Sequence, residues 1–307
     1  MELYEQSIVS NVSTNNNATS NVKFIEASWY HKGQANGRQD FEQGPRIPGS
    51  GYFDMSDIVT SQELFPNSNP RGLYLMLPTS QLFASAMDAM AIRETDHVVI
   101  IGRGDSRFTP RVWFTFRAMG HARGAVSLMQ ASLEEWITAG GPVESDAAVV
   151  MRAKDLDLNQ PPSYRVSDDS ESVIQLDKLM RLVDANTDAA VGEDDTIIVD
   201  ARGSSFSKKG YIPGAIHIPY SSLAEPTNPL RLKPTNELRA IFQAAGVDPA
   251  TDKRIVCSCG SGVSACSLYL ALEECGRIGE TVMYDGSWNE WGSHPKTPKV
   301  LPMPPTR

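Results

Sequence analysis

The two halves of the 307-residue chain repeat the same short motifs in the same order, and this internal repeat constrains the fold more than any other feature. In each half an apolar run precedes an Ile-Pro-Gly motif, a second apolar run ends in a glycine-rich turn, and a Ser-x-x-Glu-Trp motif closes the copy. The matching segments are 24–27 and 198–201, 47–49 and 212–214, 97–102 and 254–259, and 132–136 and 287–291. Short apolar strands that alternate with helical stretches predict an α/β fold, with a mainly parallel sheet flanked by helices in each half. The alternative is one large α/β domain whose halves match by chance.

Chain length and polar segments divide the sequence into four parts. At ~150 residues per domain, a chain of 307 residues predicts two domains. Residues 1–21 are rich in Asn, Ser and Thr and are expected to form a disordered leader. Residues 151–172 contain two prolines and an acidic, serine-rich run. We therefore expect a linker there, between an N-terminal domain at 22–150 and a C-terminal domain at 173–307.

Composition excludes several classes of function. Hydrophobic residues make up 41% of the chain and charged residues 21%, a balance typical of folded globular domains. The net charge of −9 argues against a direct nucleic-acid partner, because such proteins present a basic face to the phosphates. No apolar run approaches the ~18 residues of a membrane span, and the N-terminus lacks the pattern of a secretory signal. We therefore expect a cytoplasmic or mitochondrial protein that works without a membrane and keeps its four cysteines reduced.

The segment Cys259–Ser264 has the residues expected of a reactive loop. An apolar strand stops at the cysteine, two glycines follow within three residues, and an apolar helical run begins soon afterwards. Glycines let the backbone curl so that successive N–H groups point at one atom, and the helix N-terminus adds partial positive charge. A sulfur held there is more readily ionised to the nucleophilic thiolate, and the same amides would stabilise an anionic persulfide. The alternative is a buried structural cysteine beside a turn.

Two other chemistries use related arrangements and fit this sequence poorly. A cysteine phosphatase needs an arginine at the end of its loop to hold the phosphoryl group. Here Ala265 stands six residues after Cys259, and Val263 stands six residues after Cys257. A zinc site needs closely spaced ligands, but the four cysteines, at positions 257, 259, 266 and 275, form no Cys-x-x-Cys pair. We expect neither a metal nor an organic cofactor.

The loop Cys259-Gly260-Ser261-Gly262-Val263-Ser264 resembles the active loop of the two-domain rhodanese family, the thiosulfate and 3-mercaptopyruvate sulfurtransferases, and most of all the mercaptopyruvate type. Other motifs that resemble the family lie at 27–30, 47–49, 52–54, 110–113, 116–118, 200–202, 211–214 and 284–288. The resemblance implies tandem rhodanese-like domains: a catalytic C-terminal domain and a silent N-terminal copy that carries Gly102–Arg107 in place of the loop. It implies that Cys259 and Ser261 are catalytic. The loop that binds substrate and persulfide would consist of Gly260, Ser261, Gly262, Val263 and Ser264.

Three positions depart from the family pattern. The family's two carboxylate-binding arginines fall between Asp-x-Arg and Ile-Pro-Gly, but the corresponding interval here, 203–210, is shorter and contains no arginine. Lys208 and Lys209 are the candidates for binding a carboxylate, although a lysine lacks the two-pronged geometry of arginine, and a solvated surface pair is the alternative. In the family's Ser–His–Asp relay, Ser261 matches the serine, but Leu75 stands in place of the histidine and Ser56 in place of the aspartate, with Asp57 adjacent.

The resemblance implies a sulfur transfer in two steps. The Cys259 thiolate takes the outer sulfur of 3-mercaptopyruvate or thiosulfate, and Ser261 is expected to help protonate the leaving group. A thiol acceptor, such as thioredoxin or a sulfur-accepting protein, then removes the sulfur. One alternative is a persulfide relay protein that is loaded by another enzyme, since the loop also resembles fungal members linked to tRNA thiolation. The other is a non-catalytic rhodanese-like binding module.

Several other conspicuous residues are expected to be structural. We interpret them as members of ion pairs, as packed aromatic residues or as hydrogen-bonded histidines: Arg111, Arg117, Arg202, His121, His217, Trp288 and Trp291. Cys257 lies on the same face of its strand as Cys259. It is expected to pack in the core, and a role as a resolving thiol is the alternative.

Overall fold

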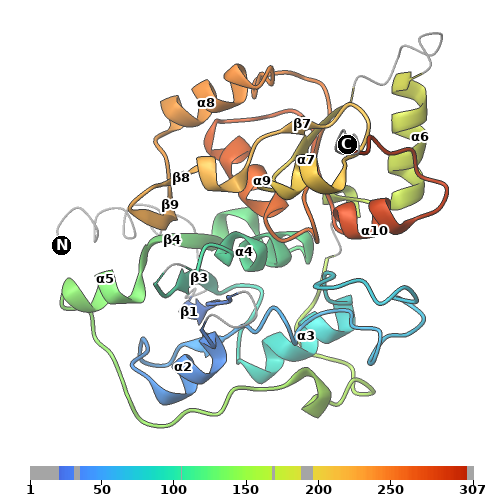
Figure 1. Cartoon of the computed structure of the whole chain (residues 1–307). Coiled ribbons are helices and arrows are strands. Elements are labelled where there is room, and N and C mark those ends of the chain that lie inside the picture. Colours follow the sequence, from blue (N-terminus) through green and yellow to red (C-terminus); the bar gives the residue numbers. More distant parts are fainter. Residues whose placement is uncertain (1–20, 31–34, 105, 168–169, 188–195, 303–307) are drawn as a thin grey trace, which may run out of the picture.

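The computed structural model describes residues 21–30, 35–104, 106–167, 170–187 and 196–302 (Figure 1). Apart from its last residue, the expected leader at 1–21 lies outside these ranges. In Figure 1 the N-terminal half, in blue to green, lies below most of the C-terminal half, in yellow to red. Each half contains its own sheet.

The N-terminal half contains a parallel four-stranded sheet in the order β2-β1-β3-β4. Its strands are β1 (Val22–Glu26), β2 (Gly51–Tyr52), β3 (His97–Gly102) and β4 (Val126–Ser132). Its helices are α2 (Gly37–Gln43), α3 (Ser80–Ala89), α4 (Thr109–Ala118) and α5 (Leu133–Thr138), with a 3₁₀ turn, η1 (Arg123–Ala125). Successive residues of β3 are apolar because both faces of the sheet are covered. Ile100 belongs to the core cluster that contains α3 and α4 residues, whereas Ile101 clusters with Leu133 of α5.

The C-terminal half contains a parallel five-stranded sheet in the order β5-β11-β10-β6-β7. The strands are β5 (Val173–Ile174), β6 (Ile197–Asp200), β7 (Ile216–His217), β10 (Ile255–Ser258) and β11 (Thr281–Tyr284). Its helices are α6 (Leu176–Thr187), α7 (Ser205–Lys209), α8 (Thr235–Ala244), α9 (Ala265–Glu274) and α10 (Ser287–Ser293), with the 3₁₀ turns η3 (Ser170–Ser172) and η4 (Tyr220–Ser222). A hairpin of β8 (Ala224–Glu225) and β9 (Asn228–Leu232) extends toward β4 of the other half.

The two sheets share one topology, which confirms the α/β fold predicted from the repeat. The order β2-β1-β3-β4 in the first half matches β7-β6-β10-β11 in the second. In each copy the strand from the second apolar run, β3 or β10, lies between the strand from the first run and the strand that precedes the Ser-x-x-Glu-Trp motif. The glycine-rich turns therefore occupy corresponding places at the carboxyl ends of these strands.

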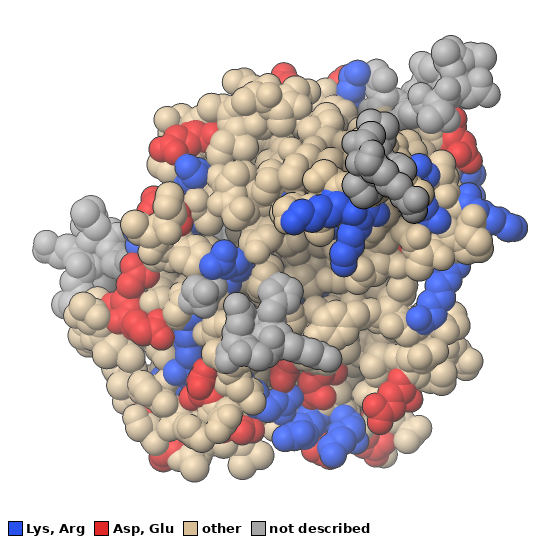
Figure 2. All heavy atoms as spheres, in the orientation of Figure 1, with Lys and Arg blue, Asp and Glu red and all other residues tan. Residues whose placement is uncertain are grey.

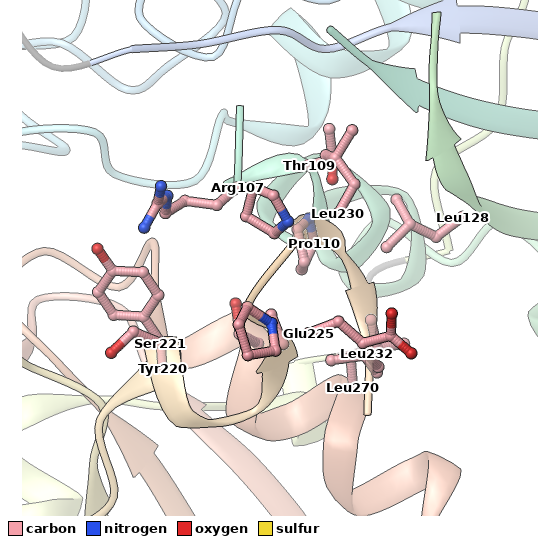
Figure 3. Close-up of a pocket in the computed structure, with 14 residues that line it drawn as sticks. Arg107, Thr109, Pro110, Leu128, Tyr220, Ser221, Glu225, Leu230, Leu232 and Leu270 are labelled. Carbon is pink, nitrogen blue, oxygen red and sulfur yellow. The ribbon is translucent and has the colours of Figure 1, made fainter. Parts of the chain in front are cut away.

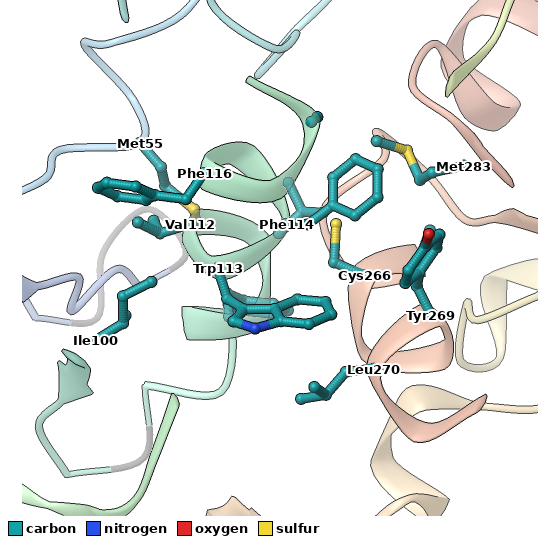
Figure 4. Packing of buried hydrophobic residues seen from close by; sticks show 14 of the residues in the cluster. Met55, Ile100, Val112, Trp113, Phe114, Phe116, Cys266, Tyr269, Leu270 and Met283 are labelled. Carbon is teal, nitrogen blue, oxygen red and sulfur yellow. The ribbon is translucent and has the colours of Figure 1, made fainter. Parts of the chain in front are cut away.

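The halves are joined by an apolar junction between α4 and α9 (Figure 4). The ring of Tyr269 on α9 lies 6.2 Å from that of Trp113 and 5.0 Å from that of Phe114, measured between centroids. Cys266 and Leu270 of α9 belong to the same buried cluster. Aromatic contacts of this kind contribute about 0.5–1.5 kcal/mol each beyond their burial. They fix α9, and with it the loop that precedes α9, against the N-terminal half.

The segment 151–172, which we propose as the linker, packs against the N-terminal half. Its 3₁₀ turn η2 (Ala153–Asp155) is anchored by the Ala153 N–H, which donates to Asp57 Oδ2 at 2.7 Å. Tyr164 is buried, and its hydroxyl lies 2.7 Å from His121 Nδ1. The division of the chain at this segment remains our proposal. Its packing shows that it follows the surface of one half over much of its length.

Candidate active site

Cys259 immediately follows β10, a fully buried strand between β6 and β11, and is itself 1% exposed. The loop Cys259–Ser264 then leads into α9 at Ala265. Gly262 has a φ of +75°, and a Cβ atom at this position would lie 2.7 Å from the Asp285 carbonyl oxygen. Because both the φ angle and the space exclude a side chain, this turn of the loop requires glycine.

The amides of the loop fall into two groups. The N–H groups of Cys259 and Gly262 donate to the Ser287 hydroxyl oxygen, at 3.0 and 3.1 Å. The N–H groups of Gly260, Ser261, Val263 and Ser264 have no hydrogen-bond acceptor within the described residues. Ser264 is the N-cap residue of α9, and its side chain makes no capping bond. Four backbone donors and a helix N-terminus are therefore available to an anion in the loop.

Ser287 and the residues after it clamp the loop from the corner between β11 and α10. Ser287 has a φ of +49°, and its hydroxyl donates to the Tyr284 carbonyl oxygen at 2.7 Å. The same oxygen lies 4.0 Å from Cys259 Sγ. The Trp288 N–H donates to the Cys259 carbonyl oxygen at 3.0 Å, and the Asn289 N–H to that of Gly260 at 2.9 Å. The repeated Ser-x-x-Glu-Trp motif marks this serine in the sequence, but no local pattern connects it to Cys259.

Arg111 of α4 joins the loop to the N-terminal half. Its Nη1 donates to the Gly262 carbonyl oxygen at 3.2 Å, and its Nη2 donates to the Leu75 carbonyl oxygen at 2.7 Å. The Nη2 atom also lies 2.8 Å from Asp285 Oδ1, while Asp285 Oδ2 accepts the Leu77 N–H at 2.8 Å. Burial is the largest influence and acts to lower the pKa of Arg111, but Asp285 and Cys266 together raise this pKa by more, so that the guanidinium stays charged.

The other cysteines are buried thiols. Burial raises the pKa of Cys266 to about 12 and also raises the pKa of Cys257. The Cys266 thiol donates to the Gly262 carbonyl oxygen at 3.3 Å. Both groups are therefore neutral near pH 7, and Cys257 packs in the core as predicted. Among the residues that the structure describes, no group of three or more His, Cys, Asp or Glu side chains could hold a metal ion.

Comparison with known proteins identifies the family. The model of the Rhodanese-like domain matches residues 183–294. The chain is 31% identical to 3-mercaptopyruvate sulfurtransferase of Mus musculus and 30% identical to thiosulfate sulfurtransferase of Cricetulus griseus, and each match covers 88% of this chain and 84% of the relative. SseA from Escherichia coli, described as a 3-mercaptopyruvate sulfotransferase, superposes with a TM-score of 0.69 and 27% identity over 94% of this chain and 96% of SseA.

The chain belongs to the rhodanese family of sulfurtransferases. The predicted family and the prediction of a sulfurtransferase enzyme are thereby confirmed. None of the helices in the described ranges has the length and apolarity needed to cross a bilayer. Figure 2 shows acidic and basic side chains in small groups over one face, where the described atoms form no continuous basic surface.

The candidate carboxylate-binding lysines are surface residues. Lys208 and Lys209 end the short helix α7, and both are exposed. Neither side chain makes a hydrogen bond or ion pair within the described part of the chain. Ser261 is half-buried, and its hydroxyl likewise has no described partner. The roles of these three side chains stay predictions.

The positions of the family's acid–base relay have taken structural roles in this chain. Leu75 has a φ of +58° and is 4% exposed, and it offers Arg111 only its carbonyl oxygen. The Ser56 hydroxyl accepts the indole N–H of Trp29 at 2.5 Å. No described histidine is hydrogen-bonded to the loop at 259–264. Neither Leu75 nor the bonded Ser56 hydroxyl can serve as a general base.

In the N-terminal copy of the loop, Gly102–Arg107, Gly102 stands at the position of Cys259, and the next residue, Arg103, forms an ion pair. Arg103 Nη2 donates to Glu26 Oε2 at 2.8 Å, and both side chains are buried. The Arg103 N–H donates to the Ser28 hydroxyl at 2.9 Å. Asp105 lies outside the described residues. The described part of this copy therefore contains no nucleophilic sulfur.

The residues predicted to be structural are confirmed as such. Arg117 pairs with Glu273 at 2.8 Å, and Arg202 pairs with Asp200 at 2.8 Å. The ring nitrogens of His121 bond to Tyr164 and to the Asp96 carbonyl oxygen, and His217 Nε2 bonds to the Arg202 carbonyl oxygen. Trp288 and Trp291 are buried.

Proposed function

We propose that this sulfurtransferase accepts sulfane sulfur from 3-mercaptopyruvate or thiosulfate as a persulfide on Cys259. The observation that supports this best is the set of loop amides described above. Four N–H groups without acceptors lie within five residues of the sulfur, and α9 begins directly behind them. Preorganised donors of this kind stabilise an anion with little reorganisation.

The loading step breaks one bond to the outer sulfur of the donor. With thiosulfate, the Cys259 thiolate attacks the outer sulfur, the sulfur–sulfur bond of the donor breaks, and sulfite leaves with the bonding pair. With 3-mercaptopyruvate, the carbon–sulfur bond breaks and the pyruvate enolate leaves, taking up a proton to become pyruvate. Ser261 lies two residues after Cys259, and we assign it the delivery of that proton. Neither step consumes an oxidant.

The second step returns Cys259 to its starting state. An acceptor thiolate attacks the outer sulfur of the persulfide and leaves as a persulfide itself, while Cys259 departs as the thiolate that the loop amides stabilise. A small thiol, thioredoxin or a sulfur-accepting protein would serve as the acceptor. We place the protein in the cytoplasm or the mitochondrion, without a membrane or a direct nucleic-acid partner.

A persulfide relay protein is the second candidate, and one observation favours it. The interval 203–210 contains no arginine, and its two lysines are exposed. A protein that is loaded by another enzyme needs no pocket for a small carboxylate. The remaining alternative, a non-catalytic binding module, is disfavoured because Cys259 and both loop glycines are present.

Intact-protein mass spectrometry tests the proposal. We expect the full chain to gain one sulfur atom after incubation with 3-mercaptopyruvate or thiosulfate, and to lose it when a thiol is added. Cys259→Ser should gain nothing. Cys275→Ser, a matched change of a buried cysteine at the far end of α9, should gain sulfur as the wild type does. Loading only by a protein donor supports the relay, and no loading by any donor contradicts sulfur transfer through Cys259.

A further inference from the structure

A pocket of about 260 Å³ lies between the two halves (Figure 3). It is walled by the loop after β3, the start of α4, the η4 turn, the β8–β9 hairpin and the first turns of α9. Most of its walls are apolar, and they include Pro110, Leu230 and Leu270. The polar groups include Arg107 from the N-terminal half and Ser221 from the C-terminal half. A largely apolar cavity with a few polar groups is typical of small-molecule sites.

The register of the sheet places this pocket close to Cys259. The Tyr220 N–H donates to the Ala201 carbonyl oxygen at 3.0 Å, and the Ala201 N–H donates to the Ser258 carbonyl oxygen at 2.8 Å. Tyr220 is therefore two strand positions from the start of the loop, about 10 Å at the usual strand spacing. Ser267, in the first turn of α9, forms part of the same pocket wall. The pocket wall is thus connected to the loop through the sheet on one side and through α9 on the other.

Arg107 is placed to recognise such an anion. It is half-buried, and Figure 3 shows its guanidinium on the Tyr220 side of the pocket. The ring of the next residue, Phe108, makes a tilted contact with the ring of Tyr220 at 5.6 Å and an edge-to-face contact with that of Trp29 at 5.4 Å, measured between centroids. This aromatic row crosses the junction and fixes the backbone that carries Arg107. A guanidinium on a fixed backbone can bind a carboxylate or a sulfonate with two parallel hydrogen bonds.

The charges around the pocket are compatible with an anionic ligand. Glu225 also forms part of the wall, but its carboxylate lies 3.8 Å from Arg231, and Figure 3 shows it on the opposite side of the pocket from the Arg107 guanidinium. Arg111 and Arg117, the arginines of α4, form ion pairs across the junction. Arg107, which lies before α4, contributes to the pocket wall.

We infer that Arg107 determines donor specificity by binding the anionic group of the sulfur donor in this interdomain pocket. It replaces, from the opposite domain, the arginines that the interval 203–210 lacks. This inference rests on the proposed loading of Cys259 by a small donor. The chemistry that 3-mercaptopyruvate and thiosulfate share is a small anion whose terminal sulfur is transferred.

Steady-state kinetics of the full chain with each donor tests the inference. We expect Arg107→Gln to raise KM about 10- to 100-fold with little change in kcat, because a charge-assisted hydrogen bond to a bound ligand is lost. Arg107→Lys should recover part of the affinity. A rise in KM for both donors would show that Arg107 binds the anionic group that they share. A rise in KM for one donor alone would show that Arg107 binds that donor only. Arg123→Gln removes an equal charge from an exposed side chain of the same half and should leave KM within about twofold of the wild type.

A measurement without turnover separates binding from chemistry. Pyruvate and sulfite, the products of the two donors, should protect Cys259 from alkylation, and Arg107→Gln should weaken this protection by the factor seen in KM. Unchanged KM and unchanged protection in Arg107→Gln would overturn the inference while leaving the proposed function intact. A loss of affinity in Lys208→Ala/Lys209→Ala instead would also overturn it, in favour of the lysines. Failure of the wild type to gain sulfur from either donor would refute the proposed function itself.

Discussion

The Ser287 hydroxyl offers the sharpest test of how the active loop is held. One oxygen atom accepts the N–H groups of Cys259 and Gly262, at 3.0 and 3.1 Å, and donates to the Tyr284 carbonyl oxygen at 2.7 Å. Ser287 itself is fully buried. Replacement by alanine removes this oxygen and supplies no other atom that can accept the two N–H groups.

The expected loss of stability follows from the groups left without partners. A buried donor or acceptor that loses its partner costs about 1–3 kcal/mol, and Ser287→Ala leaves two such N–H groups in the loop. We therefore expect the free energy of unfolding to fall by about 2–6 kcal/mol. At about 2–4 °C per kcal/mol, that corresponds to a fall in Tm of about 4–24 °C.

Activity should fall as well, because the loop loses the contact that fixes the amides of Cys259 and Gly262, and the remaining loop amides are then less well preorganised around the sulfur. Loss of one preorganised donor typically costs about 100- to 1,000-fold in kcat. Ser287 holds the loop amides and acts on the sulfur only through them. We therefore expect a smaller effect, a fall in kcat/KM of about 10- to 100-fold. Urea unfolding followed by tryptophan fluorescence measures the first effect. The rate of sulfur gain on Cys259 measures the second.

Ser293→Ala is the matched control. Ser293 lies on the same helix, α10, and its hydroxyl donates to the carbonyl oxygens of Asn289 and Glu290, but it is exposed. Water replaces these bonds, so the change in stability should stay within about 0.5 kcal/mol. If Ser287→Ala proves as stable and as active as Ser293→Ala, the hydroxyl does not hold the loop and the reasoning is wrong.

Three further predictions concern the surroundings of the loop. Arg111→Met should lower the free energy of unfolding by about 3–5 kcal/mol, measured in urea, because it leaves the Asp285 carboxylate buried without its guanidinium; wild-type stability would contradict this. Burial lowers the pKa of His121, so the folded state prefers the neutral ring, and stability should be lost as pH falls from about 6.5 through the lower pKa of the folded state. Thermal unfolding between pH 7 and pH 5 should show this loss, and a loss of equal size in His121→Asn would argue against it. Iodoacetamide at pH 8 should label Cys259 in the folded protein and leave Cys266, whose pKa burial raises to about 12, unlabelled until denaturant is added; peptide mass mapping decides between these outcomes.

The sequence was sufficient for the sheets because periodicity and turns are local properties. The apolar run at 254–259 predicted a strand that stops at Cys259, and β10 ends one residue before it. The helical run expected after the loop is α9, which begins at Ala265. Since the same pattern occurs in both halves, one topology could be expected for both, and the matching strand orders confirm it.

The contacts that hold the loop could not be read from the sequence in the same way. Arg111 and Gly262 are 151 residues apart, and Cys259 and Ser287 are 28 residues apart. Their hydrogen bonds depend on how α4 packs on α9 and on a left-handed φ at Ser287, neither of which a local pattern specifies. Arg107 was likewise hidden, because its place beside Tyr220 depends on the junction between the two halves.

Comparison of the two copies shows what the active loop requires of its neighbours. Ser132 caps α5 in a reciprocal capping box with Glu135, an arrangement typically worth about 1 kcal/mol. Ser287, at the matching position, makes no cap for α10 and adopts a φ of +49°, which costs an L-residue roughly 1–2 kcal/mol. Local helix stability therefore does not explain the conformation of Ser287. Its contacts with the amides of Cys259 and Gly262 do explain it, since a hydroxyl turned into a helix cap would leave both amides without their acceptor. The strained backbone of Ser287 thus serves to hold the loop, and it occurs in the copy that contains Cys259.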